Sequence, residues 1–202
     1  MRITGGQFKG RKLATPPGDK PGFIRPTTDR VREALFSILG RRLPGSKVLD
    51  LFAGTGCFGV EALSRGAESV VFVDSHPAAL KLISRNLAAC GQGLPAHIVR
   101  LDLSRRSSFL SLTNRLKDVY PFSIVFMDPP YEKKMAETTL TMVEKTGLVA
   151  TSGVVVVEER WNADLPDTVG SLRLELHRRY GETGIWMYSR RENETSPQQS
   201  RP

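Results

Sequence analysis

The residues best suited to chemistry are Asp128, Pro129, Pro130 and Tyr131, which follow the apolar run from Ser123 to Met127. The lone pair of an exocyclic base amine is delocalised into the ring, so an enzyme that methylates it must hold the amine with acceptors. The Asp128 carboxylate and the Pro129 carbonyl are suitable acceptors, and Tyr131 offers a flat face for a base taken out of its stack. The alternative is a strand that ends in a Pro-Pro turn with a buried tyrosine and no chemistry.

A second candidate site lies upstream, where a glycine-rich turn follows the apolar run from Val48 to Phe52. Such a turn between a strand and a helix lets a ligand approach bare backbone at the positive end of the helix. The spacing matches a dinucleotide fingerprint, but an acidic residue just before the glycines suits a cationic cofactor such as S-adenosylmethionine better than a pyrophosphate. The residues predicted to contact the cofactor here are Asp50, Phe52, Ala53, Gly54 and Gly56, with Gly59 completing the spacing.

Two further acidic residues follow predicted strands. Asp74 ends the run from Ser69 to Val73 and is placed to accept from ribose hydroxyls, and Asp102 follows His97 to Leu101 and is placed to accept from an adenine amine. A single acidic residue at a strand end is equally often a turn former or a helix cap. Several in successive strand-to-helix turns, continued by Asp128, favour one cleft at the carboxyl ends of the strands.

Composition is that of a soluble domain with a small appendage. At 202 residues and 40% apolar content the chain can bury a full core. No stretch approaches the roughly 20 apolar residues that span a bilayer, and the first residues lack a signal-peptide core. Cys57 and Cys90 have no metal-site spacing and suggest no disulfide, so we expect a cytoplasmic protein without metal. The three histidines lie in no motif and are interpreted as structural or surface residues.

Positive charge is concentrated near the N-terminus. Residues 1 to 47 hold 11 Lys and Arg against 3 Asp and Glu, a difference of +8, and the remaining residues balance at 18 against 18. The first residues read as a short strand pair or loop that exposes cations, and a phosphate backbone is the obvious partner. The alternative is a solvated, partly disordered terminus. The predicted RNA-binding residues are Arg2, Lys9, Arg11, Lys12 and Arg25.

A helix is predicted after Pro26, because Thr27 or Thr28 can cap it and Val31, Leu35, Ile38 and Leu39 recur at helical spacing. Its other face carries Arg30 and Arg32, which either meet the cofactor carboxylate or a phosphate, or are simply solvated. Thr28 and Arg30 are therefore added to the cofactor candidates.

Helix and strand patterns then alternate, which predicts a mostly parallel sheet covered on both faces. Helices are expected over 78–90, 104–119 and 135–146, and a long strand over 148–158. The segments 172–180 and 185–189 flank a turn and predict an antiparallel hairpin. From residue 192 the chain is too polar to fold. The expected division is a basic arm and helix over 1–46, a catalytic domain over 47–191 and a disordered tail over 192–202.

These motifs together resemble the RsmD family of ribosomal RNA guanine-N2 methyltransferases, over about residues 2 to 190. The two N-terminal motifs are particular to that family, whereas the two later ones are shared by many adenosylmethionine enzymes. In order, the motifs are Gly5-Gly6 with Gly10, Arg11 and Leu13; Arg25-Pro26-Thr27-Thr28-Asp29-Arg30-Val31-Arg32-Glu33; Asp50 with Phe52, Ala53, Gly54 and Gly56; and Asp128-Pro129-Pro130-Tyr131.

The resemblance implies a Rossmann-like class I methyltransferase of the α/β class, with a seven-stranded, mostly parallel sheet whose last strand is antiparallel. It also implies S-adenosylmethionine as cofactor, and as substrate one guanine of 16S RNA, the guanine 966 site of the family, in naked RNA, an assembly intermediate or the small subunit. We expect a monomer. Methylation of adenine N6 in DNA or RNA is the nearest alternative, followed by an NAD-dependent oxidoreductase and by an inactive nucleic-acid-binding module with this fold.

Overall fold

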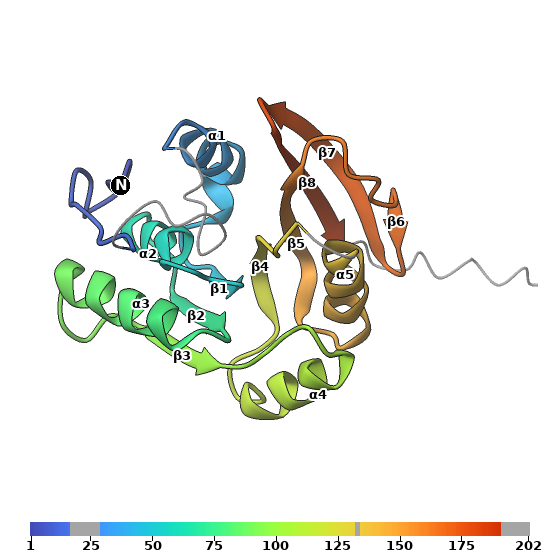
Figure 1. Ribbon diagram of the computed structural model, residues 1–202, viewed down its shortest axis with the longest axis horizontal. Coiled ribbons are helices and arrows are strands. Elements are labelled where there is room, and N and C mark those ends of the chain that lie inside the picture. The colour runs from blue at the N-terminus through green and yellow to red at the C-terminus, as the bar shows by residue number, and fades with distance from the viewer. Residues whose placement is uncertain (17–28, 132–133, 191–202) are drawn as a thin grey trace, which may run out of the picture.

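The computed structural model describes residues 1–16, 29–131 and 134–190, and its centre is a single mixed sheet. Within these ranges the sheet has eight strands in the order β3-β2-β1-β4-β5-β8-β7-β6. The first five strands in this order are parallel, and β8 runs antiparallel to β5. Helices cover both faces, and the β7–β8 hairpin extends the sheet on the far side from β3 (Figure 1). The predicted α/β class, the parallel sheet and the antiparallel last strand are confirmed.

After an N-terminal helix, strands and helices alternate from residue 47 to residue 160, and three strands then follow without a helix between them. The helices are α1 (Asp29–Leu39), the 3₁₀ turn η1 (Gly40–Arg42), α2 (Cys57–Ser64), α3 (Pro77–Cys90), α4 (Arg106–Arg115) and α5 (Met135–Lys145). The strands are β1 (Lys47–Leu51), β2 (Ser69–Asp74), β3 (Ala96–Arg100), β4 (Phe122–Met127), β5 (Val149–Arg160), β6 (Thr168–Val169), β7 (Leu172–Tyr180) and β8 (Thr183–Arg190).

Two details differ from the sequence-based expectation. The sheet has eight strands and not seven, because the two-residue strand β6 pairs with the start of β7. Helix α4 ends at Arg115 and not at Val119. The backbone N–H groups of Val119 and Tyr120 fold back onto the Leu116 carbonyl, and Pro121 disfavours helical geometry in the residue before it.

The sheet separates two hydrophobic cores. One core packs α1, α2 and α3 on the even-numbered side chains of β4 and β5, such as Ile124 and Val156. The other packs α4 and α5 on the odd-numbered ones, such as Val125 and Val157. Alternate side chains of a strand point to opposite faces, so the continuous apolar run of each strand reflects burial on both faces.

Three stacked phenylalanines join the N-terminal helix to the middle of the sheet. The ring centroids of Phe36 in α1 and Phe58 in α2 are 5.0 Å apart, and those of Phe58 and Phe126 in β4 are 4.0 Å apart. Phe58 follows the glycine turn and Phe126 lies two residues before Asp128. The stack therefore fixes the glycine turn relative to the strand that carries the Asp-Pro-Pro-Tyr motif.

The first residues form a folded arm that packs on α2 and α3. A backbone bridge between Arg2 and Lys12 closes its loop, and Ile3 and Leu13 are buried in the first core. The arm approaches the last turn of α2 so closely that a Cβ on Gly6 would lie 1.8 Å from the Ser64 carbonyl oxygen. Of the two predicted forms, the arm is the loop, closed by a single backbone bridge, and its described residues 1 to 16 pack on the first core.

A buried carboxylate anchors the arm. Glu61 in α2 is fully buried and accepts hydrogen bonds from Arg32 Nε at 2.8 Å, from Arg65 Nη2 at 2.8 Å and from the Thr4 hydroxyl. Arg32 also donates to the Arg2 carbonyl. Arg32 is only 2% exposed, so the expectation that it faces solvent, the cofactor or a phosphate is wrong. The reason is a buried ion pair with a residue 29 positions along the chain, which a local pattern does not reveal.

The described part of the chain has no helix that is both long and apolar enough to cross a membrane.

Candidate active site

The acidic residues singled out by the sequence follow neighbouring strands of the sheet. Asp102, Asp74, Asp50 and Asp128 lie at or just after the ends of β3, β2, β1 and β4, which are adjacent in that order. These four strands are parallel, so their carboxyl ends share one edge, where open α/β sheets bind ligands. The structure therefore brings the two candidate sites to neighbouring positions on one edge.

Asp74 is part of the glycine turn as well as a candidate ligand for a sugar. Its Oδ2 accepts from the Gly54 backbone N–H at 2.8 Å and its Oδ1 accepts from the His76 N–H at 2.8 Å. Each carboxylate oxygen can accept a second hydrogen bond, and the side chain is half-buried. Asp74 can therefore shape the turn and still accept from a pair of hydroxyls.

Asp50 lies beneath the turn. It is 1% exposed, and its Oδ2 accepts from the Gly59 N–H in the first turn of α2 at 3.0 Å. Burial raises its pKa well above the usual value, and the charge of Asp74 adds to the rise, although the bond from Gly59 opposes it. Asp50 thus links β1 to the first turn of α2 beneath the glycine turn.

The backbone of the turn is unusual at Phe52. Its φ of 58° lies in the left-handed region, which is uncommon for a bulky residue. Such strain is found where the surrounding structure fixes a functional conformation. Ala53 donates its N–H to the Val73 carbonyl at 3.0 Å, and Gly54 and Gly56 also have positive φ. The turn that the sequence predicted is therefore sharply bent and held against β2.

Asp102, which follows the edge strand β3, is exposed. Its Oδ1 accepts from the Ser104 N–H at 2.9 Å, and this hydrogen bond lowers the pKa of Asp102 below its usual value. The carboxylate stays charged and accessible, as an acceptor for an amine must be.

The Asp-Pro-Pro-Tyr motif follows β4 on the opposite side of β1 from Asp74. Leu51 and Met127 are partners in the parallel pair of β1 and β4, so the glycine turn and the motif leave adjacent strands at the same height. Asp128 and Tyr131 are half-buried, Pro129 is buried and Pro130 is exposed. Burial raises the pKa of Tyr131, and the nearby charges of Asp128 and Glu158 raise it further.

Sequence reasoning missed Glu158. It is 3% exposed and follows Val157, which pairs with Met127, so Glu158 and Asp128 each come directly after a paired residue on neighbouring strands. The rule that found the other acidic residues also applies here, because Glu158 follows the apolar run from Val154 to Val157 directly.

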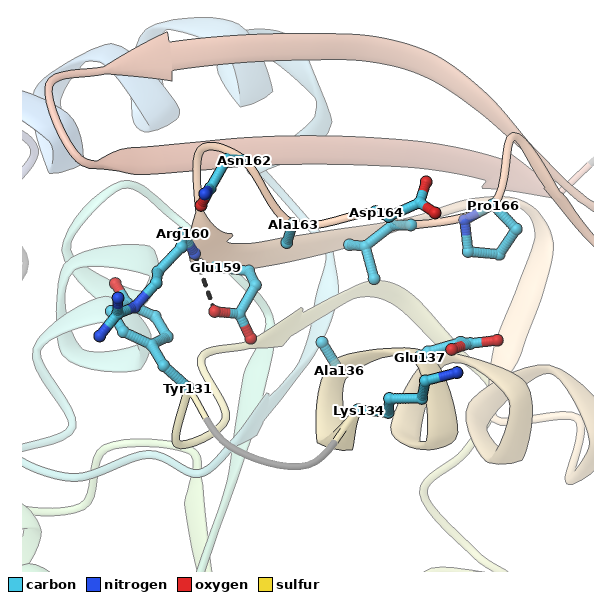
Figure 2. Close-up of a pocket in the computed structure, with 11 residues that line it drawn as sticks. Tyr131, Lys134, Ala136, Glu137, Glu159, Arg160, Asn162, Ala163, Asp164 and Pro166 are labelled. Atoms are coloured by element: carbon cyan, nitrogen blue, oxygen red, sulfur yellow. Dashed lines mark hydrogen bonds between the residues drawn. The ribbon is translucent and has the colours of Figure 1, made fainter.

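A cleft of about 500 Å³ opens beside Tyr131. It lies between the first turn of α5 and the segment that follows β5, and Figure 2 shows Tyr131 and Arg160 together at one end of it. Glu159 lies in its wall, where burial raises the pKa of the carboxyl group and the Arg160 N–H donates to Oε1 at 2.8 Å. Among the predicted site residues that the structure describes, Tyr131 alone lines this cleft, so the cleft adjoins the Asp128–Tyr131 motif and is separate from the glycine turn.

The predicted RNA-binding cations divide into two kinds. Arg2 donates to the Gly10 carbonyl at 2.8 Å and Arg11 donates to the Ala89 carbonyl in α3, so both help to hold the arm in place. Lys9 and Lys12 are exposed. These residues lie near the last turn of α2, whereas the glycine turn precedes its first. Arg30 is exposed on α1, and Arg25 and Thr28 lie outside the described residues.

Within the described ranges no three His, Cys, Asp or Glu residues come together in a way that would hold a metal ion.

The comparisons with known proteins cover the whole length of the described fold. A family model described as "Conserved hypothetical protein 95" matches residues 1–189. The chain is 36% identical over 191 residues to YlbH of Bacillus subtilis, covering 95% of this chain and 100% of the relative. It is 36% identical over 190 residues to ribosomal RNA small subunit methyltransferase D of Escherichia coli K12, covering 94% of this chain and 90% of the relative.

The fold agrees with that relationship. The solved structure of yhhF from Escherichia coli, titled as a methyltransferase, matches with a TM-score of 0.77 and 33% sequence identity, over 95% of this chain and 98% of that one. A match of this extent includes both the arm and the hairpin, and not only the common methyltransferase core. The chain therefore belongs to the RsmD family of ribosomal RNA methyltransferases.

Proposed function

We propose that the protein transfers a methyl group from S-adenosylmethionine to the N2 amine of one guanine in 16S ribosomal RNA, the family's guanine 966 site. The observation that carries this proposal is the adjacency of two turns. The glycine turn after β1 and the Asp128–Tyr131 motif after β4 leave paired parallel strands at the same height. A cofactor on the first turn and a base on the second can then meet at the sheet edge.

The residues around the glycine turn fit S-adenosylmethionine. That cofactor carries a sulfonium, an ammonium and a ribose with two free hydroxyls, and the edge offers carboxylates without a metal cluster among the described residues. Asp74 would accept from the hydroxyls, Asp102 from the adenine amine, and the backbone from Phe52 to Gly56 would line the site. When bound, the sulfonium supplies a methyl group that is already activated for transfer.

The motif after β4 would hold the base. Guanine presents two neighbouring donors, N1–H and the N2 amine, and the Asp128 carboxylate can accept from both. Adenine presents an acceptor at N1, which a carboxylate would repel. Tyr131 would stack on the ring and hold the amine nitrogen in place for transfer, and alignment of this kind accounts for much of the rate of such a reaction. The N2 proton that is lost passes to Asp128 and on to solvent.

The test is a nucleoside digest of small-subunit RNA from cells that lack the protein, complemented with variants. We expect one N2-methylguanosine to be missing, wild type to restore it, and Asp128→Ala to fail. Asp118→Ala removes an exposed carboxylate before β4 and should restore it fully. In vitro, Asp128→Ala should lower turnover by orders of magnitude while cofactor affinity stays within a few-fold. A missing N6-methyladenine in place of the guanosine would give the adenine alternative.

A further inference from the structure

Two arginines stack on aromatic rings beyond the amine site, at the end of β5 and in the β7–β8 hairpin. The Arg160 guanidinium carbon lies 5.6 Å from the Tyr131 ring centroid. The Arg179 guanidinium carbon lies 3.7 Å from the Trp161 ring centroid. We call these four residues the β5–hairpin strip. Both arginines are exposed, and Trp161 is half-buried.

The hairpin lies against the Asp128–Tyr131 motif. Thr183 is the β8 partner of Arg160, and its hydroxyl group opposes the rise in the pKa of Tyr131, which places the start of β8 beside that ring. The Trp161 N–H donates to the Glu182 carbonyl at 3.0 Å. The strip therefore starts at the Tyr131 ring, which is proposed to receive the target base, and continues along the sheet edge away from the glycine turn.

Arg179 is pre-organised although it is exposed. Its Nε donates to the Gly181 carbonyl at 2.9 Å, its guanidinium covers the indole, and its Nη2 is 3.9 Å from the Glu182 carboxylate, which is 88% exposed. An exposed ion pair of that length contributes little. One plane of the guanidinium is thus held on Trp161 while its opposite plane and outer N–H groups can meet a ligand.

Guanidinium planes stacked on aromatic rings suit single-stranded RNA. Bases stack on aromatic and guanidinium planes, and arginine contacts phosphate at the same time. The described residues of the arm lie near the far end of α2, a helix of eight residues and about 12 Å in length, so the strip is closer than the arm to the proposed base-binding motif. The strip lies at the edge where those nucleotides must pass, and the cleft beside Tyr131 opens next to it (Figure 2).

We propose that the β5–hairpin strip binds the nucleotides that flank the methylated base, with a base on Arg179 stacked over Trp161 and with phosphates on Arg160 and Arg179. This inference rests on the proposed function in taking RNA as the substrate. It places the contacts with the flanking nucleotides on β5 and the hairpin, apart from both the glycine turn and the arm.

The test measures binding of protein-free small-subunit ribosomal RNA over a range of salt concentrations. The double variant Arg160→Gln with Arg179→Gln should lower the slope of log affinity against log salt by up to about 1.4, at about 0.7 for each single-strand phosphate contact. Arg173→Gln is the matched control, because Arg173 is an exposed arginine at the opposite end of β7. The control should bind within twofold of wild type. A double variant that behaves like Arg173→Gln overturns the proposal.

A second pair of variants separates stacking from charge. Trp161→Ala should weaken RNA binding by at least about fivefold, the lower range for loss of one base stack. Arg179→Lys keeps the positive charge but removes the planar guanidinium group. It should therefore also weaken RNA binding but leave the slope of log affinity against log salt unchanged. If Arg179→Lys binds the RNA as tightly as wild type does, the assignment of a base stacked on Arg179 is overturned. Melting temperature and calorimetric titration of S-adenosylmethionine, both expected to match wild type for Arg179→Lys, exclude a folding defect.

The two proposals can fail separately. If wild type binds the RNA but methylates none of it, the proposed function is wrong, and the comparison of variants with Arg173→Gln still decides the role of the strip. If wild type methylates the RNA and the strip variants bind it as wild type does, the strip proposal alone is overturned.

Discussion

Asp74 has a structural role at this sheet edge, and we propose that it also binds the cofactor. Its two oxygens already accept from the backbone of Gly54 and His76. A hydrogen bond to a charged group contributes about 1.5 to 3 kcal/mol. We expect Asp74→Ala to weaken S-adenosylmethionine binding by about this amount, and also to lower the melting temperature because the glycine turn loses its support. Calorimetry and thermal melting measure the two effects, with Glu68→Gln, an exposed residue before β2, as control. Unchanged cofactor affinity would remove Asp74 from the site.

Asp50 gives a prediction about pH. Its folded pKa is raised by burial above the unfolded value of 3.8, so between the two values the folded state binds a proton that the unfolded state does not. Stability must therefore fall as pH rises through that window. Asp50→Asn cannot titrate, and its amide oxygen can still accept from Gly59. We expect the difference in free energy of unfolding, Asp50→Asn minus wild type, to increase as pH rises from about 5.

Asp102→Asn is the control for this measurement, in urea unfolding from about pH 5 to pH 8. The pKa of Asp102 is lowered, so its contribution to stability is lost only as pH falls below 3.8 and should be constant over the measured range. A constant difference between wild type and Asp50→Asn over the same range would show that Asp50 carries no burial penalty.

At the scale of elements, the arm explains why its first motif needs glycine. Gly6 has a φ of 77° and no room for a Cβ beside Ser64, whereas Gly10 has a φ of 82° and open space around it. Alanine at either position should lower the free energy of unfolding by about 1 to 2 kcal/mol, because its Cβ is strained in the left-handed backbone conformation. We expect Gly6→Ala to cost clearly more than Gly10→Ala, because only Gly6→Ala must also push the arm off α2 and break the bonds of Gln7 and Phe8 to Ser64. Urea unfolding of the two variants measures the difference, and equal losses would contradict the docked arm.

The elements themselves were largely predictable, because their patterns are local. Apolar runs identified the strands, and acidic residues at their ends identified the edge, since the carboxyl ends of parallel strands meet. Arg32 was misplaced because its position depends on Glu61 in another element. Trp161 and Arg179 were missed for the same reason: they are 18 positions apart, and they meet because β5 pairs with β8 and β8 pairs with β7.

At the scale of the whole molecule, the proposed sites follow one another along the edge of the sheet. The residues proposed to bind the cofactor lie at the ends of β1 to β3, the proposed base-binding motif follows β4, and the strip lies on β5 and the hairpin. The arm lies apart from them beside α2 and α3 (Figure 1). The charge excess of the first 47 residues predicted a basic surface, but counting charges does not locate it. An RNA that reaches both the arm and Asp128 must span the length of α2.

The arm's role in RNA binding is best tested with the lysines. Arg2 and Arg11 hold the arm together, so replacing them confuses charge with folding, whereas Lys9 and Lys12 are exposed. Neutralising both lysines to glutamine should lower the slope of log RNA affinity against log salt by up to about 1.8, since each contact with duplex phosphate contributes about 0.9. Cofactor affinity and melting temperature should not change, because neither lysine reaches the sheet edge.

The matched control replaces Lys117 and Lys145, which are exposed near α4 and α5, and removes the same charge from the opposite face of the sheet. If both pairs lower the slope equally, the arm acts only through the net charge of the protein, and the path of the RNA over α2 must be abandoned.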